Sequence, residues 1–121
     1  MKIKMILVDE HKILLDGLRS LLERESRVEV VAEALDGYTA LELVSELSPD
    51  VVIIEVALPM LNGIEATRQI FSQNPDVKIL ALSMYSDIKY AAEMFKAGAV
   101  GYLPKDCSYK ELIFAIKSIL S

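Results

Sequence analysis

Residues 50–63 read D-V-V-I-I-E-V-A-L-P-M-L-N-G, and this stretch decides the fold. The run V-V-I-I at residues 51–54 is apolar and β-branched, is too short for a helix, and does not alternate with polar residues. Such a run is typical of a strand that is buried on both faces of a parallel sheet. Glu55 follows the strand at once, and Pro59 and an Asn-Gly pair then mark a loop. Because open α/β sheets place their sites at the carboxyl ends of strands, we expect Glu55 to be the centre of the function.

The composition is that of one compact, acidic domain. A chain of 121 residues, 53% of them hydrophobic, is long enough for one buried core and too short for two domains. No stretch approaches the roughly 18 continuous apolar residues of a membrane span, and no signal peptide is apparent, which predicts a cytoplasmic protein. Cys107 is the only cysteine, which excludes an internal disulfide and a multi-cysteine metal site. A net charge of −5 argues against DNA or a membrane as the direct partner of this segment.

Strand and helix patterns alternate along the chain. Short apolar runs predict five strands, and apolar residues at helical spacing predict five helices. The predicted strands are residues 5–8, 28–34, 51–54, 77–83 and 100–103. The predicted helices begin near His11, after Asp36-Gly37, at Asn62, at Ser86-Asp87 and at Ser108. Strands that are buried on both faces require a parallel sheet with helices on each side, so residues 1–121 are predicted to form one doubly wound α/β domain.

Polar residues at fixed spacing predict where several helices begin and end. Asn62 with Glu65, and Ser108 with Glu111, are interpreted as caps in which the acid reaches back to the helix start. Gly98 suits the left-handed residue that ends the fourth helix. Ile64, Thr67, Ile70 and Phe71 are expected to face inward from the third helix, Ala91, Ala92 and Phe95 mark the fourth, and Leu112, Ile113, Ile116, Ile119 and Leu120 mark the last.

Charged and hydroxyl side chains follow four of the predicted strands. Asp9 and Glu10 follow the first strand, Glu55 the third, Ser83 ends the fourth, and Lys105 follows the fifth. Because the carboxyl ends of parallel strands open on one edge, we expect these side chains to converge. Three neighbouring carboxylates need raised pKa values or a cation, and hard oxygen ligands favour Mg²⁺ over a transition metal. Lys105 supplies a compact positive charge for an anion in the same pocket, and Ser83 supplies a hydroxyl donor.

These motifs resemble those of the receiver domain of two-component response regulators. The acidic pair, the acid followed by L-P-M-L-N-G, the hydroxyl and the G-Y-L-P-K-D segment occur in the family's order and spacing across residues 3–120. V-D-E-H at residues 8–11, E-A-L-D-G at residues 33–37 and A-G-A-V-G-Y-L-P-K-D at residues 97–106 are most similar to the subgroup with a C-terminal LuxR-type helix-turn-helix. The resemblance implies a signalling module of a transcription regulator rather than an enzyme.

The resemblance also implies a fold and a set of site residues. The implied fold is flavodoxin-like, with five strands in the order 2-1-3-4-5. The implied magnesium ligands are Asp9, Glu10, Glu55 and the backbone carbonyl of Ala57. Ser83 and Lys105 are implied to bind the phosphoryl group, and Ser83 and Tyr102 are implied to form the switch; ordinary packing of Tyr102 is the alternative. The implied partners are a sensor histidine kinase or other regulator and a second copy of the chain, while DNA would be bound by a domain beyond residue 121.

Glu55 departs from the family pattern, in which the phosphoacceptor is an aspartate. Phosphoryl transfer needs in-line placement, and a displacement of about 1 Å costs on the order of 100-fold in rate. The extra methylene also carries the carboxylate toward the place of a phosphoryl group, where it is able to pair with Lys105 and Ser83. It would imitate that group only in part, because it lacks the roughly two charges and three oxygens of a phosphate. Three alternatives stay open: a receiver that works without phosphorylation, an Asp-to-Glu substitution in a competent receiver, and slow phosphorylation of Glu55.

A second class of function uses similar chemistry. Carboxylates, a lysine, a hydroxyl and Mg²⁺ also serve a small magnesium-dependent, phosphatase-like hydrolase. Such enzymes need an aspartate nucleophile and a cap, and this chain has a glutamate and no insertion long enough for a cap. We expect His11 to be a first-turn helix residue without chemistry. Cys107 is expected to be inert, and a reactive thiol near a helix start is the alternative.

Overall fold

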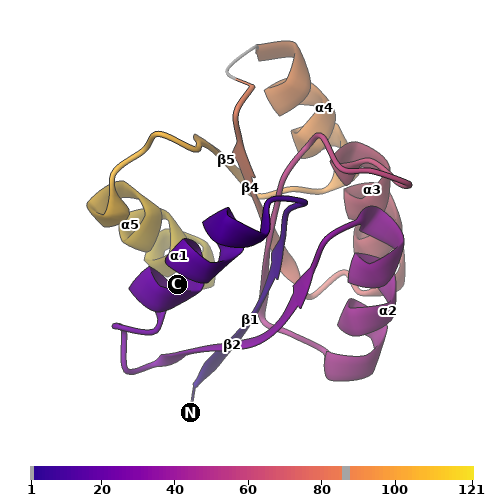
Figure 1. Ribbon diagram of the computed structural model, residues 1–121. Helices are drawn as coiled ribbons and strands as arrows, with labels where there is room; N and C mark the ends of the chain where they lie inside the picture. Colours follow the sequence, from indigo (N-terminus) through magenta and orange to yellow (C-terminus); the bar gives the residue numbers. More distant parts are fainter. Residues whose placement is uncertain (1, 86–87) are drawn as a thin grey trace.

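The computed structural model describes residues 2–85 and 88–121 as alternating strands and helices (Figure 1). The strands are β1 (Ile3–Val8), β2 (Val28–Ala34), β3 (Val51–Ile54), β4 (Lys78–Ser83) and β5 (Gly101–Pro104). The helices are α1 (Lys12–Leu22), α2 (Gly37–Leu47), α3 (Gly63–Gln73), α4 (Ile88–Ala97) and α5 (Tyr109–Leu120). The predicted start of the fourth helix at Ser86-Asp87 lies outside the described residues. Within the described ranges, no helix has the length and apolar character needed to cross a membrane.

The strands form one parallel sheet in the order β2-β1-β3-β4-β5, which confirms the predicted flavodoxin-like order. The central strand β3 pairs with β1 on one side and with β4 on the other. In this register Ile54 lies between Val8 and Ala81, so the strands end close to one another at the carboxyl edge. At the edge strand, Ser83 of β4 pairs with Pro104 of β5. The pairing therefore brings the residues that follow β1, β3 and β5 to one place.

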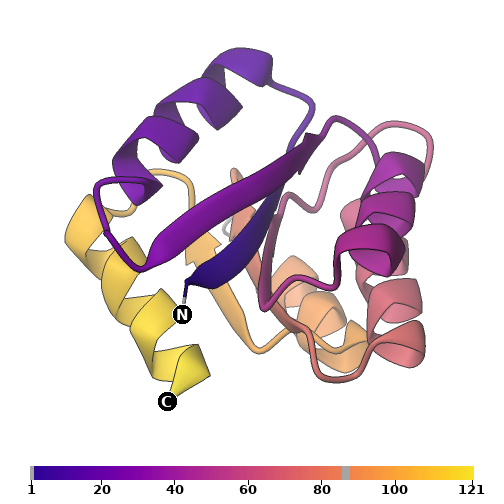
Figure 2. The same ribbon diagram turned by 90° about the horizontal axis from the view of Figure 1, so that it is seen from below.

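Helices cover both faces of the sheet. Helices α1 and α5 lie on one face, and α2, α3 and α4 lie on the other, as both views show (Figures 1 and 2). Successive residues of β3 divide between two cores: Val52 and Ile54 pack with the α2, α3 and α4 side, and Val51 and Ile53 pack with the α1 and α5 side. All four side chains are buried. The predicted burial of this strand on both faces is confirmed.

The two predicted helix caps differ in the structure. The capping box of Ser108 and Glu111 is complete, with both reciprocal hydrogen bonds present. At α3, the Asn62 side chain accepts a hydrogen bond from the Glu65 backbone N–H at 2.9 Å, as predicted. The Glu65 side chain, however, contacts Arg68 one turn further along instead of reaching back. The predicted return contact of Glu65 is wrong, because a cation three residues on offers the carboxylate a charged partner.

Two aromatic residues in the predicted apolar faces are exposed in the structure. Phe71 is 45% exposed and Phe95 is 49% exposed. Gly98 has φ +123° at the end of α4, as predicted for a left-handed residue, and a Cβ there would lie 2.5 Å from Cγ of Phe71. Phe71 thus covers this glycine from outside the core. On α4 the fully buried side chain is Met94, one residue before Phe95, so the buried face of this helix is turned relative to the prediction.

Candidate functional site

The carboxyl ends of four strands bring four of the predicted site residues together. Asp9, Glu55 and Ser83 are 3%, 3% and 0% exposed, and the Lys105 side chain is 11% exposed. The Glu55 backbone N–H donates to the Val8 carbonyl at 3.0 Å, and the Lys105 backbone N–H donates to the Ser83 carbonyl at 2.8 Å. The hydrogen bonds of the sheet therefore continue one residue past the strands and fix where these side chains start.

Lys105 joins the two buried acids. Its Nζ lies 2.6 Å from Oδ2 of Asp9 and 2.7 Å from Oε1 of Glu55. Burial works against the charged form of Lys105, but its hydrogen bonds to Asp9 and Glu55 outweigh burial and raise its pKa. Lys105 is therefore charged at neutral pH. Short, charge-assisted contacts of this kind are the strong class of hydrogen bond.

The Glu55 carboxylate is surrounded by donors. They are the Ser83 hydroxyl at 2.7 Å, the Lys105 ammonium at 2.7 Å, and the backbone N–H groups of Val56 at 2.6 Å, Ala57 at 3.3 Å and Met84 at 3.3 Å. Burial alone would raise the pKa of Glu55, but the hydrogen bonds from Lys105 and Ser83 outweigh it and lower the pKa. Glu55 is therefore a buried, ionised carboxylate, and both of its oxygens accept hydrogen bonds.

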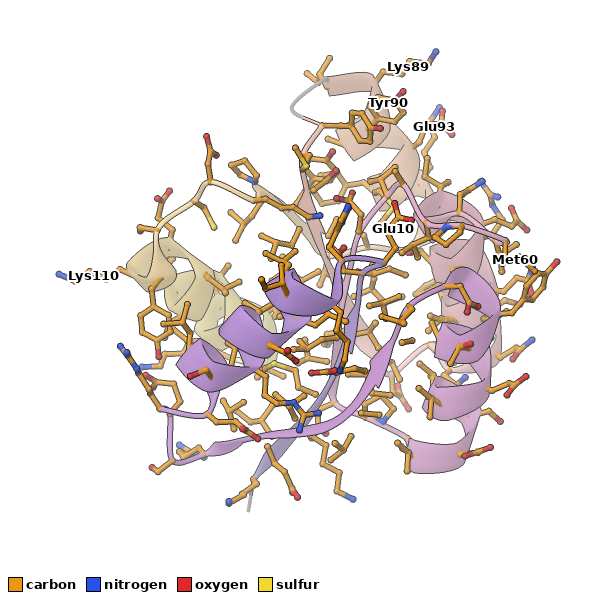
Figure 3. The ribbon with its side chains drawn as sticks, in the orientation of Figure 1. Glu10, Met60, Lys89, Tyr90, Glu93 and Lys110 are labelled. Carbon is orange, nitrogen blue, oxygen red and sulfur yellow. The ribbon has the colours of Figure 1, made fainter. Side chains whose placement is uncertain are left out.

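The loop after β3 folds back onto Glu55. Gly63, which begins α3, lies so close that a Cβ there would be 2.0 Å from the Glu55 carbonyl oxygen. Its N–H donates to the Val56 carbonyl at 2.7 Å. Met60 has φ +70° and its side chain lies at the outer rim of the molecule (Figure 3). The end of the L-P-M-L-N-G loop thus packs against the Glu55 backbone, where only glycine fits.

Three further residues for which the sequence made predictions follow β1 and β3, and each makes different contacts. Glu10 is exposed at this edge of the sheet (Figure 3), and Ala57 turns its amide N–H toward Glu55. His11 precedes α1 with an extended backbone rather than lying in the first turn, and both its N–H and its Nδ1 lie 2.9 Å from Oδ1 of Asp9. The prediction for His11 is wrong in this respect: the ring turns back to the acid two residues earlier. The Asp-x-His spacing is the signal for this contact, since Asp side chains bond the backbone two residues on.

The predicted magnesium ligands do not fit a metal ion in this arrangement. Within residues 2–85 and 88–121, no group of three or more His, Cys, Asp or Glu side chains is placed to hold one. A carboxylate oxygen offers about two acceptor positions. Oε2 of Glu55 meets three donors and Oε1 meets two, while Oδ1 of Asp9 faces the backbone N–H and the ring Nδ1 of His11. Of the four oxygens of the two buried acids, only Oδ2 of Asp9 retains an acceptor position among the described contacts, and Mg²⁺ requires a near-octahedral oxygen shell.

A chain of contacts leads from Glu55 to β5 and α4. The Ser83 hydroxyl donates to Glu55 and accepts the Tyr85 N–H at 3.0 Å. The Tyr102 hydroxyl donates to the Tyr85 carbonyl, and the ring centroids of Tyr85 and Tyr90 lie 4.9 Å apart. Tyr90 belongs to α4 and is labelled in Figure 3. Tyr102 therefore holds a defined hydrogen bond in addition to its packing. The arrangement links the position of the Glu55 carboxylate to the segment between β4 and α4.

Cys107 has no features of a reactive thiol. It is half-buried before α5. Burial raises its pKa, and the negative charges of Glu111 and Asp106 raise it further. A thiol with a raised pKa is a poor nucleophile at neutral pH, which agrees with the prediction that Cys107 is inert.

Comparison with known protein families identifies the family to which this fold belongs. Residues 5–117 match the family described as the response regulator receiver domain. The chain therefore belongs to the response regulator receiver domain family. The family resemblance inferred from the sequence motifs is confirmed.

Its relatives include transcriptional regulatory proteins and response regulators. The chain is 40% identical over 118 residues to the transcriptional regulatory protein DegU of Brevibacillus brevis and 36% identical over 119 residues to the response regulator UvrY of Escherichia coli K12, covering 98% of this chain in both cases. It covers 50% and 55% of those proteins, so it spans about half their length. A LuxR-family two-component response regulator from Aurantimonas sp. SI85-9A1 superposes with a TM-score of 0.94 at 40% identity, over 99% of this chain and 86% of that one. The similarity to the LuxR-type subgroup is thus confirmed.

Proposed function

We propose that this chain is a receiver domain that regulates transcription and that Glu55, at the phosphoacceptor position, holds its pocket in a phosphoryl-like arrangement. Membership of the family and the transcription regulators among its relatives support the first part. The observation that carries the second part is the reach of Glu55, whose carboxylate contacts both Ser83 and Lys105. These are the two residues to which the resemblance assigns the phosphoryl group. Glu55 thus supplies an anion where phosphorylation would otherwise place one.

This proposal makes Glu55 a poor nucleophile. A carboxylate attacks through a lone pair, and each Glu55 oxygen already accepts at least two hydrogen bonds. The charge is also stabilised by Lys105, as the lowered pKa of Glu55 indicates. The hydrolase alternative needs a free nucleophile at this position, and no contact of Glu55 favours it.

The output of the domain follows from the contacts beyond Ser83. We propose that the Glu55–Ser83 contact fixes Tyr85, and that Tyr85 sets the positions of Tyr102 and Tyr90 on β5 and α4. Partners that contact α4, β5 or α5 would then sense the state of the pocket. We propose a second copy of the chain and a cytoplasmic sensor kinase or other regulator as these partners. DNA contact belongs to a separate domain, because this segment carries a net charge of −5.

A phosphodonor assay on two matched chains tests the proposal. This chain and its Glu55→Asp variant are incubated with acetyl phosphate and Mg²⁺, and intact mass is measured. We expect the Glu55→Asp variant to gain the mass of one phosphoryl group and this chain to remain unmodified. An additional Asp50→Asn change in the variant serves as the control, since Asp50 lies exposed at the opposite end of β3.

Two results would contradict the proposal in different ways. Modification of this chain at Glu55 would make it a slow phosphoacceptor rather than a built-in anion. Failure of both chains to react would remove the phosphorelay interpretation of the pocket altogether.

A further inference from the structure

The pocket already contains a cation that belongs to the chain. Two buried carboxylates, from Asp9 and Glu55, face the single ammonium of Lys105 at 2.6 and 2.7 Å. The ammonium bridges one oxygen of each acid, which is where a divalent ion shared by the two acids would have to bind. A dication at the same oxygens would meet a like charge at close range in a buried site, where screening is weak.

The second oxygen of each buried acid already faces donors from the chain. The second oxygen of Asp9 faces the backbone N–H and the Nδ1 of His11 at 2.9 Å. The second oxygen of Glu55 accepts hydrogen bonds from Ser83, Val56 and Ala57. To bind both acids, a metal would have to displace Lys105 or break several of these other contacts.

We infer that Lys105 is the resident cation of this pocket and closes it to Mg²⁺, so that the state of this receiver does not depend on the metal. The inference rests on the proposed function, because it is the extra methylene of Glu55 that places one oxygen against Lys105 and the other against Ser83. Closure of the pocket to Mg²⁺ is a separate claim from the imitation of a phosphoryl group by Glu55. It concerns which cation neutralises the Asp9 and Glu55 carboxylates. It assigns to Lys105 a role that the family resemblance gives to a magnesium ion.

Paramagnetic line broadening measures closure directly on the unmodified chain. Mn²⁺ replaces Mg²⁺ as the probe and is titrated into the ¹⁵N-labelled chain while backbone amide signals are followed. We expect the amide signals of Asp9, Val56 and Ala57 to lose intensity at no lower Mn²⁺ concentration than the signals at exposed acidic positions such as Glu42. Selective loss of the Asp9, Val56 and Ala57 signals at lower Mn²⁺ would overturn the inference.

Two lysine variants test whether the ammonium is the cause of closure. Lys105→Ala removes the resident cation, whereas Lys110→Ala removes a lysine that projects from the start of α5 away from the site (Figure 3). Thermal unfolding is recorded with and without millimolar Mg²⁺. We expect Mg²⁺ to raise the midpoint of Lys105→Ala and to leave the midpoints of this chain and of Lys110→Ala unchanged, since a ligand stabilises only the state that binds it.

The outcomes separate closure from the proposed function. A Mg²⁺-dependent rise in the midpoint of the unmodified chain, equal to that of Lys105→Ala, would refute closure by Lys105 and leave the phosphodonor result untouched. If Lys105→Ala does not fold, the Mn²⁺ titration of the unmodified chain still decides the question. Modification of Glu55 by a phosphodonor would refute phosphoryl mimicry while leaving the Mn²⁺ result to stand on its own.

Discussion

The two ends of strand β3 carry the same kind of side chain in opposite surroundings. Asp50 precedes the strand and is exposed, and its carboxylate accepts one hydrogen bond, from the Lys4 backbone N–H at 2.8 Å. Glu55 follows the strand, is 3% exposed and meets five donors. Both backbones are held by the neighbouring strands in the same way. The difference teaches that the place in the sheet decides whether an acid forms a site.

The carboxyl edge of the sheet forms a site because backbone N–H donors and a lysine side chain meet there. Loops that leave β3 and β4 turn their backbone N–H groups toward the strand end, at Val56 and Met84. The edge strand β5 delivers Lys105 to the same point. At the amino edge the only donor to the Asp50 carboxylate among the described contacts is one backbone N–H.

The largest effect is expected from removing the cation at the Glu55 end. Lys105→Met leaves Asp9 and Glu55 buried side by side without a countercharge, so we expect the free energy of unfolding to fall by about 3–5 kcal/mol. Urea denaturation measures this change in the free energy of unfolding. Lys110→Met, at an exposed lysine, is the control and should stay within about 0.5 kcal/mol of the parent. A loss below about 1 kcal/mol for Lys105→Met would show that the buried pair is not held as described.

Matched acid-to-amide changes compare the two ends of β3 directly. Glu55→Gln removes a charge that accepts from Lys105 and places an NH₂ group among donors, so we expect it to lower the free energy of unfolding by about 2 kcal/mol. Asp50→Asn keeps an oxygen for the Lys4 N–H and should cost about 0.5 kcal/mol or less. Equal losses of unfolding free energy in Glu55→Gln and Asp50→Asn would contradict the proposed difference between the two ends of β3.

The parent chain and Glu55→Gln are also expected to differ in how their free energy of unfolding depends on pH. The folded-state pKa of Glu55 is lowered from its ordinary 4.5, so the stability from its charge is present above that value and is lost as pH falls through the lower, folded value. The Glu55→Gln variant has no such loss. The gap in unfolding free energy between the two chains should therefore narrow in that acidic range, and a constant gap would argue against a lowered pKa.

A smaller effect is expected one step beyond the site. Tyr102→Phe removes the hydrogen bond to the Tyr85 carbonyl, which should cost about 1 kcal/mol. Amide hydrogen exchange should also speed up at Tyr85, because its segment loses one of the contacts that hold it. Unchanged exchange there would break the proposed link between the pocket and β5.

A small effect of opposite sign is expected at a buried polar group that lacks a partner among the described residues. The Thr67 hydroxyl on α3 is fully buried and has no hydrogen-bond partner among the residues that the structure describes. Thr67→Val removes an unsatisfied group at nearly constant size, so the free energy of unfolding should change by less than about 1 kcal/mol, with stabilisation as the expected sign. A loss above about 1 kcal/mol in urea denaturation would reveal a partner for this hydroxyl.

Sequence patterns predicted the sheet and the meeting of the site residues for a clear physical reason. The β-branched run of residues 51–54 is unambiguous, and parallel topology then forces Asp9, Glu55, Ser83 and Lys105 to one edge. The donors from Val56 and Met84 were not predicted, because backbone N–H groups leave no trace in side-chain identity.

Other misses come from small rotations and local competition. On α4 the apolar residues Met94 and Phe95 are adjacent, and packing rather than pattern decides that Met94 enters the core. At α3, Arg68 attracts the Glu65 side chain that the cap pattern assigned to the helix start. His11 turned back to Asp9 because its backbone is extended before α1 begins. Each of these differences depends on one side-chain conformation or on the rotation of one helix about its axis.

The central claim is that the Glu55 carboxylate is an ionised anion held by Lys105 and Ser83. Its most direct test is the titration of the Glu55 side-chain carboxyl carbon by ¹³C NMR, in this chain and in Lys105→Met. We predict a pKa below 4.5 in this chain and a rise on loss of the lysine, since burial then acts with one fewer opposing partner. A pKa at or above 4.5 in this chain, unchanged in Lys105→Met, would contradict the account.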